Sequence, residues 1–464
     1  MPVHQEPCQH KVLQLEPSNF AELAGYKRLD ARKRYAATTK SGRAPRKKEG
    51  HAVEDAATEL AQSFPGPLVL PHDDLNYDPT SSSQSLRSWL HEKERNKPSQ
   101  QRKTIYVANI PEITPAMASM EDWTKPILSP DRGDPATKKL ESLVSPDVEN
   151  LVDYLSAFYH GMAVKKFPQV LKWVSWEEEE GKSSTKSRPP GVPKHVGLAY
   201  GDNVTRIRAR PSPDGLFKGQ LDLNDILDAA TDMLPTDAYS IIVPVDHDIH
   251  EGEEDDFCCG RAYGGSRICV VQTARYHPVL DRGNKIDHEH TWPASHCKDY
   301  VDGICASEEI EPIPAVPTQI GASQLGPLRA AISAASLIPP PSTIEELRVL
   351  WFARLARTAA HELGHCMGMD HCVYYACNMQ GTAGMTEDGR QPPYLCPVCL
   401  GKISHAVACE LQHGSEEARK VYVRQRYEAL GEFCKRWEGN GLFAGFGAWI
   451  GERLGKVEEE ESEH

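Results

Sequence analysis

The sequence has no stretch of about 18 consecutive uncharged apolar residues, the least that a membrane-spanning helix needs, so we expect no membrane span. The N-terminus, MPVHQEPCQHKVLQLEPSNF, lacks a basic start followed by an apolar core and does not have the pattern of a secretory signal peptide. Positive charge is also in deficit, because the net charge is −14 at pH 7. Phosphate contacts need a basic surface, so this charge argues against a nucleic-acid partner.

The composition is otherwise that of a globular protein, with 39% hydrophobic and 25% charged residues in a chain of 464. This length allows two to three domains, or one large domain with insertions. Thirteen cysteines without a secretory signal indicate thiols and metal ligands rather than disulfides. We therefore expect a cytoplasmic or nuclear protein, and we favour a monomer although the sequence does not fix the oligomeric state.

The two ends of the chain differ from its middle. Residues 1–100 have weak periodicity and are predicted to form an N-terminal extension that is partly disordered. Its basic cluster at residues 26–48 is interpreted as a solvated helix and linker, with a nuclear-localisation or anion-binding segment as the alternative. Residues 438–464 form a tail with an acidic end, and we expect its aromatic residues to dock on their own domain rather than on a partner.

Residues 101–437 alternate between strand and helix patterns. The patterns predict buried strands at 103–110 and 239–245, amphipathic helices at 145–162 and 221–234, and a hairpin at 257–276. A proline-rich, irregular insertion occupies about 281–341. The alternation predicts an α/β domain with a mixed, mostly parallel twisted sheet, and two helical patterns after residue 396 predict a smaller helical C-terminal subdomain.

A long helix is predicted to begin near Thr343. Thr343 and Glu346 have the spacing of a capping box, and apolar residues then recur every three or four positions on one face. Nothing in the sequence breaks this helix before Gly368.

The end of this helix carries the sequence HELGHCMGMDH. His361 and His365 are four residues apart, so a helix presents both imidazoles to one point, as two ligands of a tetrahedral zinc would require. Glu362 is placed to accept a hydrogen bond from a zinc-held water. His371 can return to the same metal only if the helix stops, and Gly368 allows this because glycine accepts positive φ. Cys366 points about 100° away from His365 and is interpreted as a packed thiol.

Two further clusters of histidines and acidic residues, at 245–251 and 287–297, lack a helical frame and a ligand spacing. We interpret both as surface loops.

Four cysteines follow His371 before residue 400: Cys372, Cys377, Cys396 and Cys399. Their spacings, with four residues inside the first pair and two inside the second, are typical of a closed, structural zinc site. Disulfide pairing is the alternative. Met379 lies eight residues after His371, where a methionine is either plain core or the Met-turn beneath a three-histidine zinc site.

Together the motifs HELGHCMGMDHC, CNM and CPVC resemble the archaemetzincins, zinc metallopeptidases with the pattern HExxHxxGxxHC, CxM and CxxC. The resemblance covers roughly residues 100–437. It implies a metzincin-like catalytic domain with a long active-site helix and two zinc ions, one catalytic and one structural. The catalytic zinc would bind His361, His365 and His371, with Glu362 as general base above the Met379 turn.

The function that the residues and the resemblance imply is hydrolysis of short peptides in an aminopeptidase-like manner. The peptide substrate would lie extended along an edge strand, for which residues 265–273 are the candidate. The alternative is a zinc-stabilised module that does not catalyse but binds or regulates other proteins.

Overall fold

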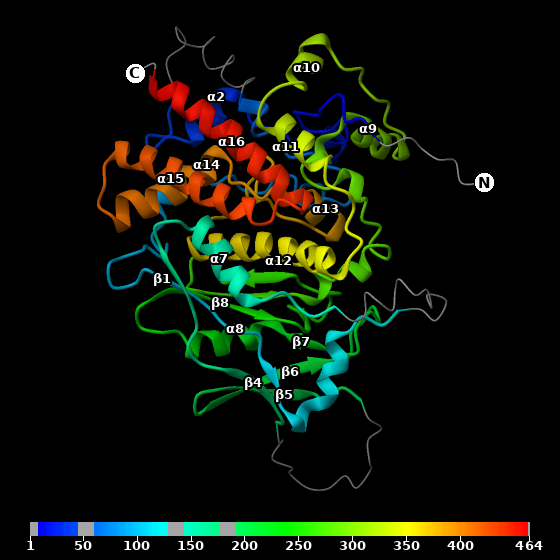
Figure 1. The fold of residues 1–464 in the computed structure, drawn as a ribbon, viewed down its shortest axis with the longest axis vertical. Coiled ribbons are helices and arrows are strands. Elements are labelled where there is room, and N and C mark those ends of the chain that lie inside the picture. Colours follow the sequence, from blue (N-terminus) through cyan, green and yellow to red (C-terminus); the bar gives the residue numbers. More distant parts are fainter. Residues whose placement is uncertain (1–7, 45–59, 129–142, 177–190, 463–464) are drawn as a thin grey trace, which may run out of the picture. The chain divides into compact units, whose positions relative to one another are not determined.

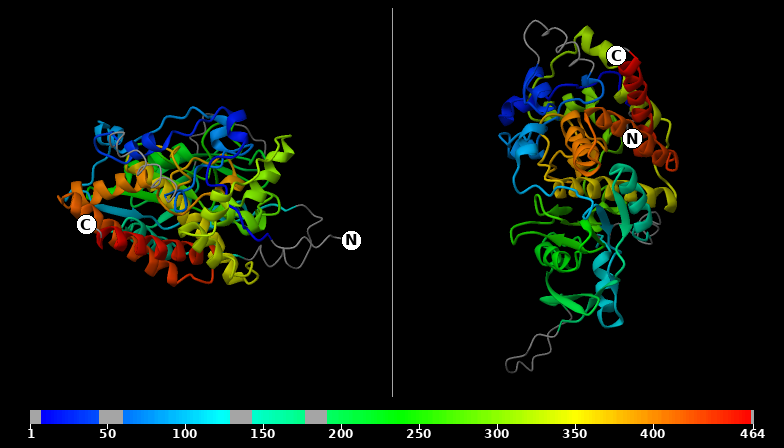
Figure 2. Two further views of the ribbon diagram at one scale, coloured as in Figure 1. Left: turned by 90° about the horizontal axis from the view of Figure 1, so that it is seen from above. Right: turned by 90° about the vertical axis from the view of Figure 1, so that its left-hand side faces the viewer.

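The computed structural model describes residues 8–44, 60–128, 143–176 and 191–462 (Figures 1 and 2). The chain divides into two compact units, each built from separate stretches of sequence. We call Asn96–Asp281 with Ser342–Gly368 the sheet unit, and Met1–Arg95 with Arg282–Pro341 and Met369–His464 the helical unit. The two units are described in turn.

The first sheet of the sheet unit has five strands in the order β10-β11-β8-β1-β3. Every pair in it is parallel except β10 and β11, which form the antiparallel hairpin predicted from the sequence. All eight residues of β8 are buried, as expected for a continuous apolar strand inside a parallel sheet. The strands are β1 (Thr104–Val107), β3 (Ala163–Lys166), β8 (Ala238–Val245), β10 (Gly260–Ala262) and β11 (Ile268–Gln272).

A second sheet, of six strands in the order β2-β4-β5-β6-β7-β9, was not predicted. It is mainly antiparallel, and only the pairs at its two ends are parallel. Its long strand β6 is mostly exposed or half-buried, so it lacks the apolar run that marks a buried strand. The strands are β2 (Glu112–Ile113), β4 (Leu171–Val174), β5 (His195–Tyr200), β6 (Asn203–Arg210), β7 (Gln220–Asp222) and β9 (Asp248–His250). The fold of this unit is therefore α/β with mixed sheets.

Three longer helices complete the sheet unit, and each begins at a residue whose side chain caps it. Asp147 and Asp222 accept backbone hydrogen bonds at the starts of α7 and α8, and Thr343 forms the predicted capping box with Glu346 at the start of α12. The helices are α7 (Val148–Phe158), α8 (Leu223–Asp232) and α12 (Ile344–Cys366), and short 3-10 helices include η2 (Pro115–Thr124) and η4 (Ala274–Tyr276).

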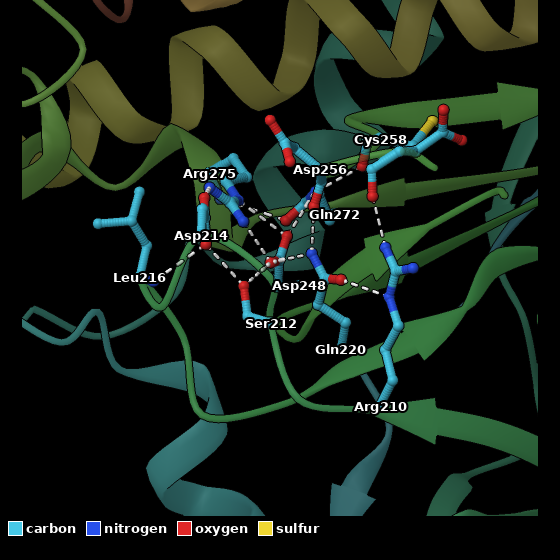
Figure 3. Close-up of polar contacts among 11 residues, drawn as sticks. Arg210, Ser212, Asp214, Leu216, Gln220, Asp248, Asp256, Cys258, Gln272 and Arg275 are labelled. Carbon is cyan, nitrogen blue, oxygen red and sulfur yellow. Dashed lines mark hydrogen bonds and ion pairs between the residues drawn. The ribbon is translucent and has the colours of Figure 1, made fainter. Parts of the chain in front are cut away.

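A buried ion network joins β9 to the segment that follows β11 (Figure 3). The guanidinium of Arg275 donates to both carboxylate oxygens of Asp248, at 2.9 and 2.5 Å, and also pairs with Asp214. Gln220 of β7 and Gln272 of β11 donate to the same Asp248 carboxylate. These contacts satisfy a charge whose side chain is fully buried. Residues 245–251 are therefore not the predicted surface loop.

The helical unit contains no strand among its described residues. Its last helix, α16 (Gly441–Ser462), carries the aromatic residues of the C-terminal tail. This helix packs along α11 (Pro327–Ala335) and α15 (Glu416–Lys435), as Figures 1 and 2 show. Trp449 is buried and stacks on Tyr394 at 4.5 Å between ring centroids. The aromatic part of the tail therefore docks on its own unit, as predicted, whereas the side chains of residues 457–464 lie outside the described ones.

The helices of this unit come from all three of its stretches. Residues 281–341, for which an irregular insertion was predicted, contain α9, α10 and α11. None of the described helices combines the length and apolar character that a membrane crossing needs. The helices are α1 (Phe20–Ala24), α2 (Ala31–Ala37), α4 (Asp74–Tyr77), α5 (Leu86–His91), α9 (Lys298–Ser307), α10 (Pro317–Ala322), α11 (Pro327–Ala335), α13 (Met385–Arg390), α14 (Pro397–Ser404), the π-helix η8 (His405–Leu411), α15 (Glu416–Lys435) and α16 (Gly441–Ser462).

Candidate functional site

Helix α12 brings two histidines of the sheet unit together near its C-terminal end. The Nε2 atoms of His361 and His365 are 3.0 Å apart. Two nitrogens bound to one tetrahedral zinc, each at about 2.05 Å, would be separated by about 3.3 Å. The pair therefore has the spacing of two ligands on one cation.

Glu362 is buried beside the edge strand β10. The backbone N–H of Ala262 donates to its carboxylate, and a Cβ added at Gly260 would come within 3.1 Å of its Cγ. Burial raises the pKa of Glu362 to about 8, while the nearby Arg261 guanidinium acts in the opposite direction. Desolvation thus favours the protonated form of this carboxyl, which makes it a better proton acceptor than an exposed glutamate.

Helix α12 ends where the sequence predicted. Gly368 has φ of 72°, and its N–H donates to the carbonyl of His365 at 2.8 Å. The left-handed conformation of Gly368 ends the helix, and glycine adopts it without the strain that a side chain would cause. His371 follows three residues later and belongs to the helical unit.

Within the helical unit, His371 has a carboxylate neighbour. A Cβ added at Gly381 would contact the Asp74 carboxylate and would lie 2.8 Å from His371 Nδ1. Burial raises the pKa of Asp74, and His371 acts against this shift. Gly381 is thus required by close approach rather than by its backbone angle.

The chain after His371 is fixed by backbone and side-chain bonds. The N–H of Cys372 donates to the carbonyl of the buried Met379 at 2.6 Å. Glu387 accepts from the backbone of Asp74 and Ala383, each at 2.8 Å. A segment of the N-terminal extension therefore supports the loop that carries Met379.

The four predicted cysteines lie together in the helical unit. The Sγ atoms of Cys372, Cys377, Cys396 and Cys399 all lie within 4.8 Å of one another, and all four residues are buried. None is in a disulfide, and the Sγ atoms of Cys372 and Cys396 are 3.5 Å apart. Hydrogen bonds from the three neighbouring thiols hold the pKa of Cys372 well below its usual value. The donor set fits a tetrahedral thiolate site for zinc.

Two predictions about neighbouring residues have different outcomes. Cys366 is fully buried and its thiol lies beside that of Cys269, so the interpretation as a packed thiol agrees with its surroundings. The choice of residues 265–273 as an edge strand is wrong, because β11 lies between β10 and β8. In the hairpin the outer strand is the first one, and hydrophobicity alone does not identify it.

Sequence analysis did not single out Asp74, Glu387 or the Arg390–Asp73 ion pair, whose guanidinium and carboxylate are both buried. Asp73 and Asp74 lie in the sequence PHDDLNYD, which has acidic residues but no periodic frame. Asp73 and Asp74 are about 300 residues away in sequence from the residues at 371–390 that they contact. No local pattern links the two segments, so no signal in the sequence would have revealed these contacts.

Comparisons with known proteins agree with the motifs. Residues 338–405 match the family model described as Peptidase family M54. The chain is 42% identical over 81 residues to Archaemetzincin-2 of Homo sapiens, covering 18% of this chain and 21% of that protein. It is 36% identical over 62 residues to Archaemetzincin-1 of Homo sapiens, covering 13% of this chain and 12% of that protein. The matching stretch thus spans about a fifth or less of the length of these relatives.

Solved structures give a weaker similarity. A crystal structure of Archaemetzincin from Methanopyrus kandleri is 14% identical with a TM-score of 0.31, covering 67% of this chain and 98% of that chain. A second one, from Archaeoglobus fulgidus in complex with malonate, is 14% identical with a TM-score of 0.26, covering 64% and 99%. On the sequence matches, the chain is similar to the archaemetzincins, and its similarity to peptidase family M54 lies in residues 338–405.

Proposed function

We propose that the chain is a zinc-dependent metallopeptidase that hydrolyses peptide bonds. The observation that carries the proposal is the pair His361 and His365 with the buried Glu362 between them on α12, inside the stretch that matches Peptidase family M54. In this proposal α12 is the active-site helix of a metzincin-like domain extending over residues 101–437.

His361, His365 and His371 would hold the catalytic zinc. The chemistry of the donor set fits, because three neutral imidazoles leave the fourth tetrahedral position open. Zinc bound there would lower the pKa of a water and polarise the scissile carbonyl. The left-handed turn at Gly368 supports the return of the chain toward His365, and Met379 would form the Met-turn beneath the three histidines.

Glu362 would act as the general base. Its carboxylate would take a proton from the attacking water and return it to the leaving amine. The backbone N–H of Ala262 orients this carboxylate, and the burial that raises its pKa also keeps bulk water away from it. Substrate would lie as an extended strand beside β10, which is one of the two outer strands of the first sheet. Short peptides, cleaved in an aminopeptidase-like manner, are the proposed substrates.

A second zinc would bind Cys372, Cys377, Cys396 and Cys399. Four protein ligands leave no open position, so this site would be structural. Because the N–H of Cys372 donates to the carbonyl of Met379, the structural site and the Met-turn share one backbone segment.

The proposal is tested by replacing Glu362 with Gln in the full chain and measuring turnover of short peptides together with zinc content. We expect unchanged zinc content and a fall in turnover of at least about 100-fold, the contribution of a general base. Glu345→Gln is the matched control, because Glu345 lies in the exposed first turn of the same helix. Unchanged turnover in Glu362→Gln would contradict the mechanism. A wild-type chain that binds zinc and hydrolyses no peptide would favour the non-catalytic interaction module instead.

A further inference from the structure

A second cluster of soft ligands lies in the helical unit, outside the stretch that matches Peptidase family M54. It comprises Cys8 and His10 from the N-terminal segment and His290 and Cys297 from the segment before α9. One ligand atom from each residue lies within 4.8 Å of all the others. The sequence 287–297, interpreted above as a surface loop, therefore supplies half of a compact cluster.

The two imidazoles of this cluster have nitrogens without a protein partner. His290 Nδ1 contacts the carboxylate of Asp287 at 2.7 Å, and the ring stacks on Tyr300 at 4.4 Å between centroids. The Nε2 atoms of His290 and His10 are both buried and make no hydrogen bond. A buried polar atom without a partner is costly, and a carboxylate on the opposite ring nitrogen is the usual support of a metal-binding histidine.

The two sulfur atoms have the spacing of ligands on one metal. Cys8 Sγ and Cys297 Sγ are 3.4 Å apart, well beyond the roughly 2.05 Å of a disulfide bond. Two thiolates on a tetrahedral zinc, each at about 2.3 Å, would be about 3.7 Å apart. Cys372 and Cys396, in the four-cysteine cluster, have a nearly equal spacing of 3.5 Å. The backbone N–H groups of Asp299 and Tyr300, at the start of α9, also donate to the Cys297 sulfur.

Backbone contacts hold the two halves of the cluster in place. Leu13 forms an isolated β-bridge with Cys297, and the N–H of Lys298 donates to the carbonyl of Val12 at 2.9 Å. The guanidinium of Arg329 donates to the carbonyl of His10 at 2.6 Å, and His10 itself has φ of 45°. A positive φ is uncommon for a residue other than glycine, and these contacts hold His10 in this conformation.

We propose that Cys8, His10, His290 and Cys297 bind one zinc ion in a closed, structural site. Two thiolates and two imidazoles are a donor set that suits zinc, and with four protein ligands there is no open position for substrate. The ion would fasten the N-terminal segment to the start of α9. The proposal does not depend on peptidase activity, because none of these residues belongs to the catalytic or four-cysteine clusters.

The test is the zinc content of the full chain, purified under reducing conditions, measured by mass spectrometry for wild type, Cys8→Ser and His290→Ala. We expect each variant to lose one zinc equivalent relative to wild type. The matched controls are Cys305→Ser, a buried thiol in α9, the helix that Cys297 precedes, and His288→Ala, an exposed histidine two residues from His290. We expect both controls to keep the wild-type zinc content. Equal zinc content in wild type, Cys8→Ser and His290→Ala would overturn the proposal.

A second measurement uses only the wild-type chain, so a folding defect in a variant cannot confuse it. Bound zinc should protect Cys8 from alkylation, and removal of zinc by a chelator should speed its alkylation at least tenfold. The modified residue is identified by peptide mass spectrometry. An alkylation rate that is the same with and without chelator would overturn the proposal, as would a Cys8–Cys297 disulfide in the reduced, purified chain.

Discussion

The sheet unit and the helical unit are stabilised in different ways. The sheet unit has two hydrogen-bonded sheets, a large apolar cluster around β8 and α8, and buried ion pairs such as Arg275–Asp248 and Arg354–Asp281. The helical unit has no strand among its described residues, and its helices pack around buried aromatic rings such as those of Phe64, Tyr394 and Trp449 as well as around smaller apolar clusters. It also holds two compact groups of cysteine and histidine ligands.

This difference shows what metal ions would contribute to each unit. In the sheet unit, the backbone hydrogen bonds of the two sheets and the apolar cluster around β8 and α8 connect neighbouring elements. In the helical unit, the ligand clusters connect segments that are far apart in sequence, as the N-terminal segment and α9 are. A bound ion adds folding free energy by holding such distant segments together. We therefore propose that the helical unit depends on zinc and that the sheet unit does not.

The largest effect is expected for Cys396→Ala. Removing one ligand of the four-cysteine cluster should abolish that zinc site, whose binding free energy is on the order of 10 kcal/mol in small zinc domains. We expect the helical unit to become sensitive to limited proteolysis and the chain to lose one zinc. Cys434→Ala is the control, because Cys434 is a buried thiol of the same unit outside both clusters. Equal resistance of Cys396→Ala and wild type would contradict the prediction.

A large effect without metal loss is expected for Arg275→Met in the sheet unit. The change leaves the Asp248 carboxylate buried without its cation, which should cost about 3–5 kcal/mol of unfolding free energy. Urea denaturation measures this loss, and zinc content should stay unchanged. Lys166→Met, which removes an exposed pair with Glu149, should cost at most about 1 kcal/mol. Equal losses of unfolding free energy in Arg275→Met and Lys166→Met would contradict a larger contribution from the buried network than from an exposed ion pair.

A moderate, pH-dependent effect is expected for His277→Gln in the sheet unit. Burial lowers the pKa of His277 to about 4, and its ring packs on Trp351. Since the unfolded chain binds the proton more tightly, the neutral ring's contribution is fully present above about pH 6.5 and is lost as the pH falls toward 4.

At pH 5 this linkage amounts to roughly 2 kcal/mol. Urea denaturation at pH 7 and pH 5 gives the acid-induced loss of unfolding free energy, and we expect it to be smaller in His277→Gln by about that amount. Equal acid-induced losses in the variant and in wild type would contradict the assignment.

The smallest effect is expected for Thr343→Ala. The variant removes the hydroxyl that accepts the N–H of Glu346 at the start of α12 and should cost about 1 kcal/mol. Thr124 is a half-buried residue at the end of η2, and Thr124→Ala should change the unfolding free energy by less than about 0.5 kcal/mol. Urea denaturation compares the two variants. A loss no larger in Thr343→Ala than in Thr124→Ala would contradict the role of the capping box.

The same comparison explains what could be predicted from the sequence. Strand β8 was predicted because its residues are continuously apolar, and α12 because Thr343 and Glu346 mark its start and Gly368 its end. Both signals are local. The second sheet was missed because half-exposed strands such as β6 have no comparable pattern.

The ligand clusters likewise could be predicted only where their residues form a local pattern in the sequence. The four cysteines could be grouped from the sequence because they lie within a short stretch with recognisable pairs. Cys8 and Cys297 could not, since neither spacing nor periodicity relates them and only the folded chain brings their sulfur atoms together. Asp74 beside His371 was missed for the same reason.

The most direct test of the account is hydrogen exchange on the full chain before and after zinc is removed by a chelator. The account predicts that amides of α9 and α14, whose N-cap residues are Cys297 and Cys396, exchange much faster in the zinc-free chain. Amides of β8 and α8 should keep their protection. Unchanged exchange in α9 and α14, or an equal loss of protection in β8 and α8, would contradict the claim that zinc stabilises one unit and not the other.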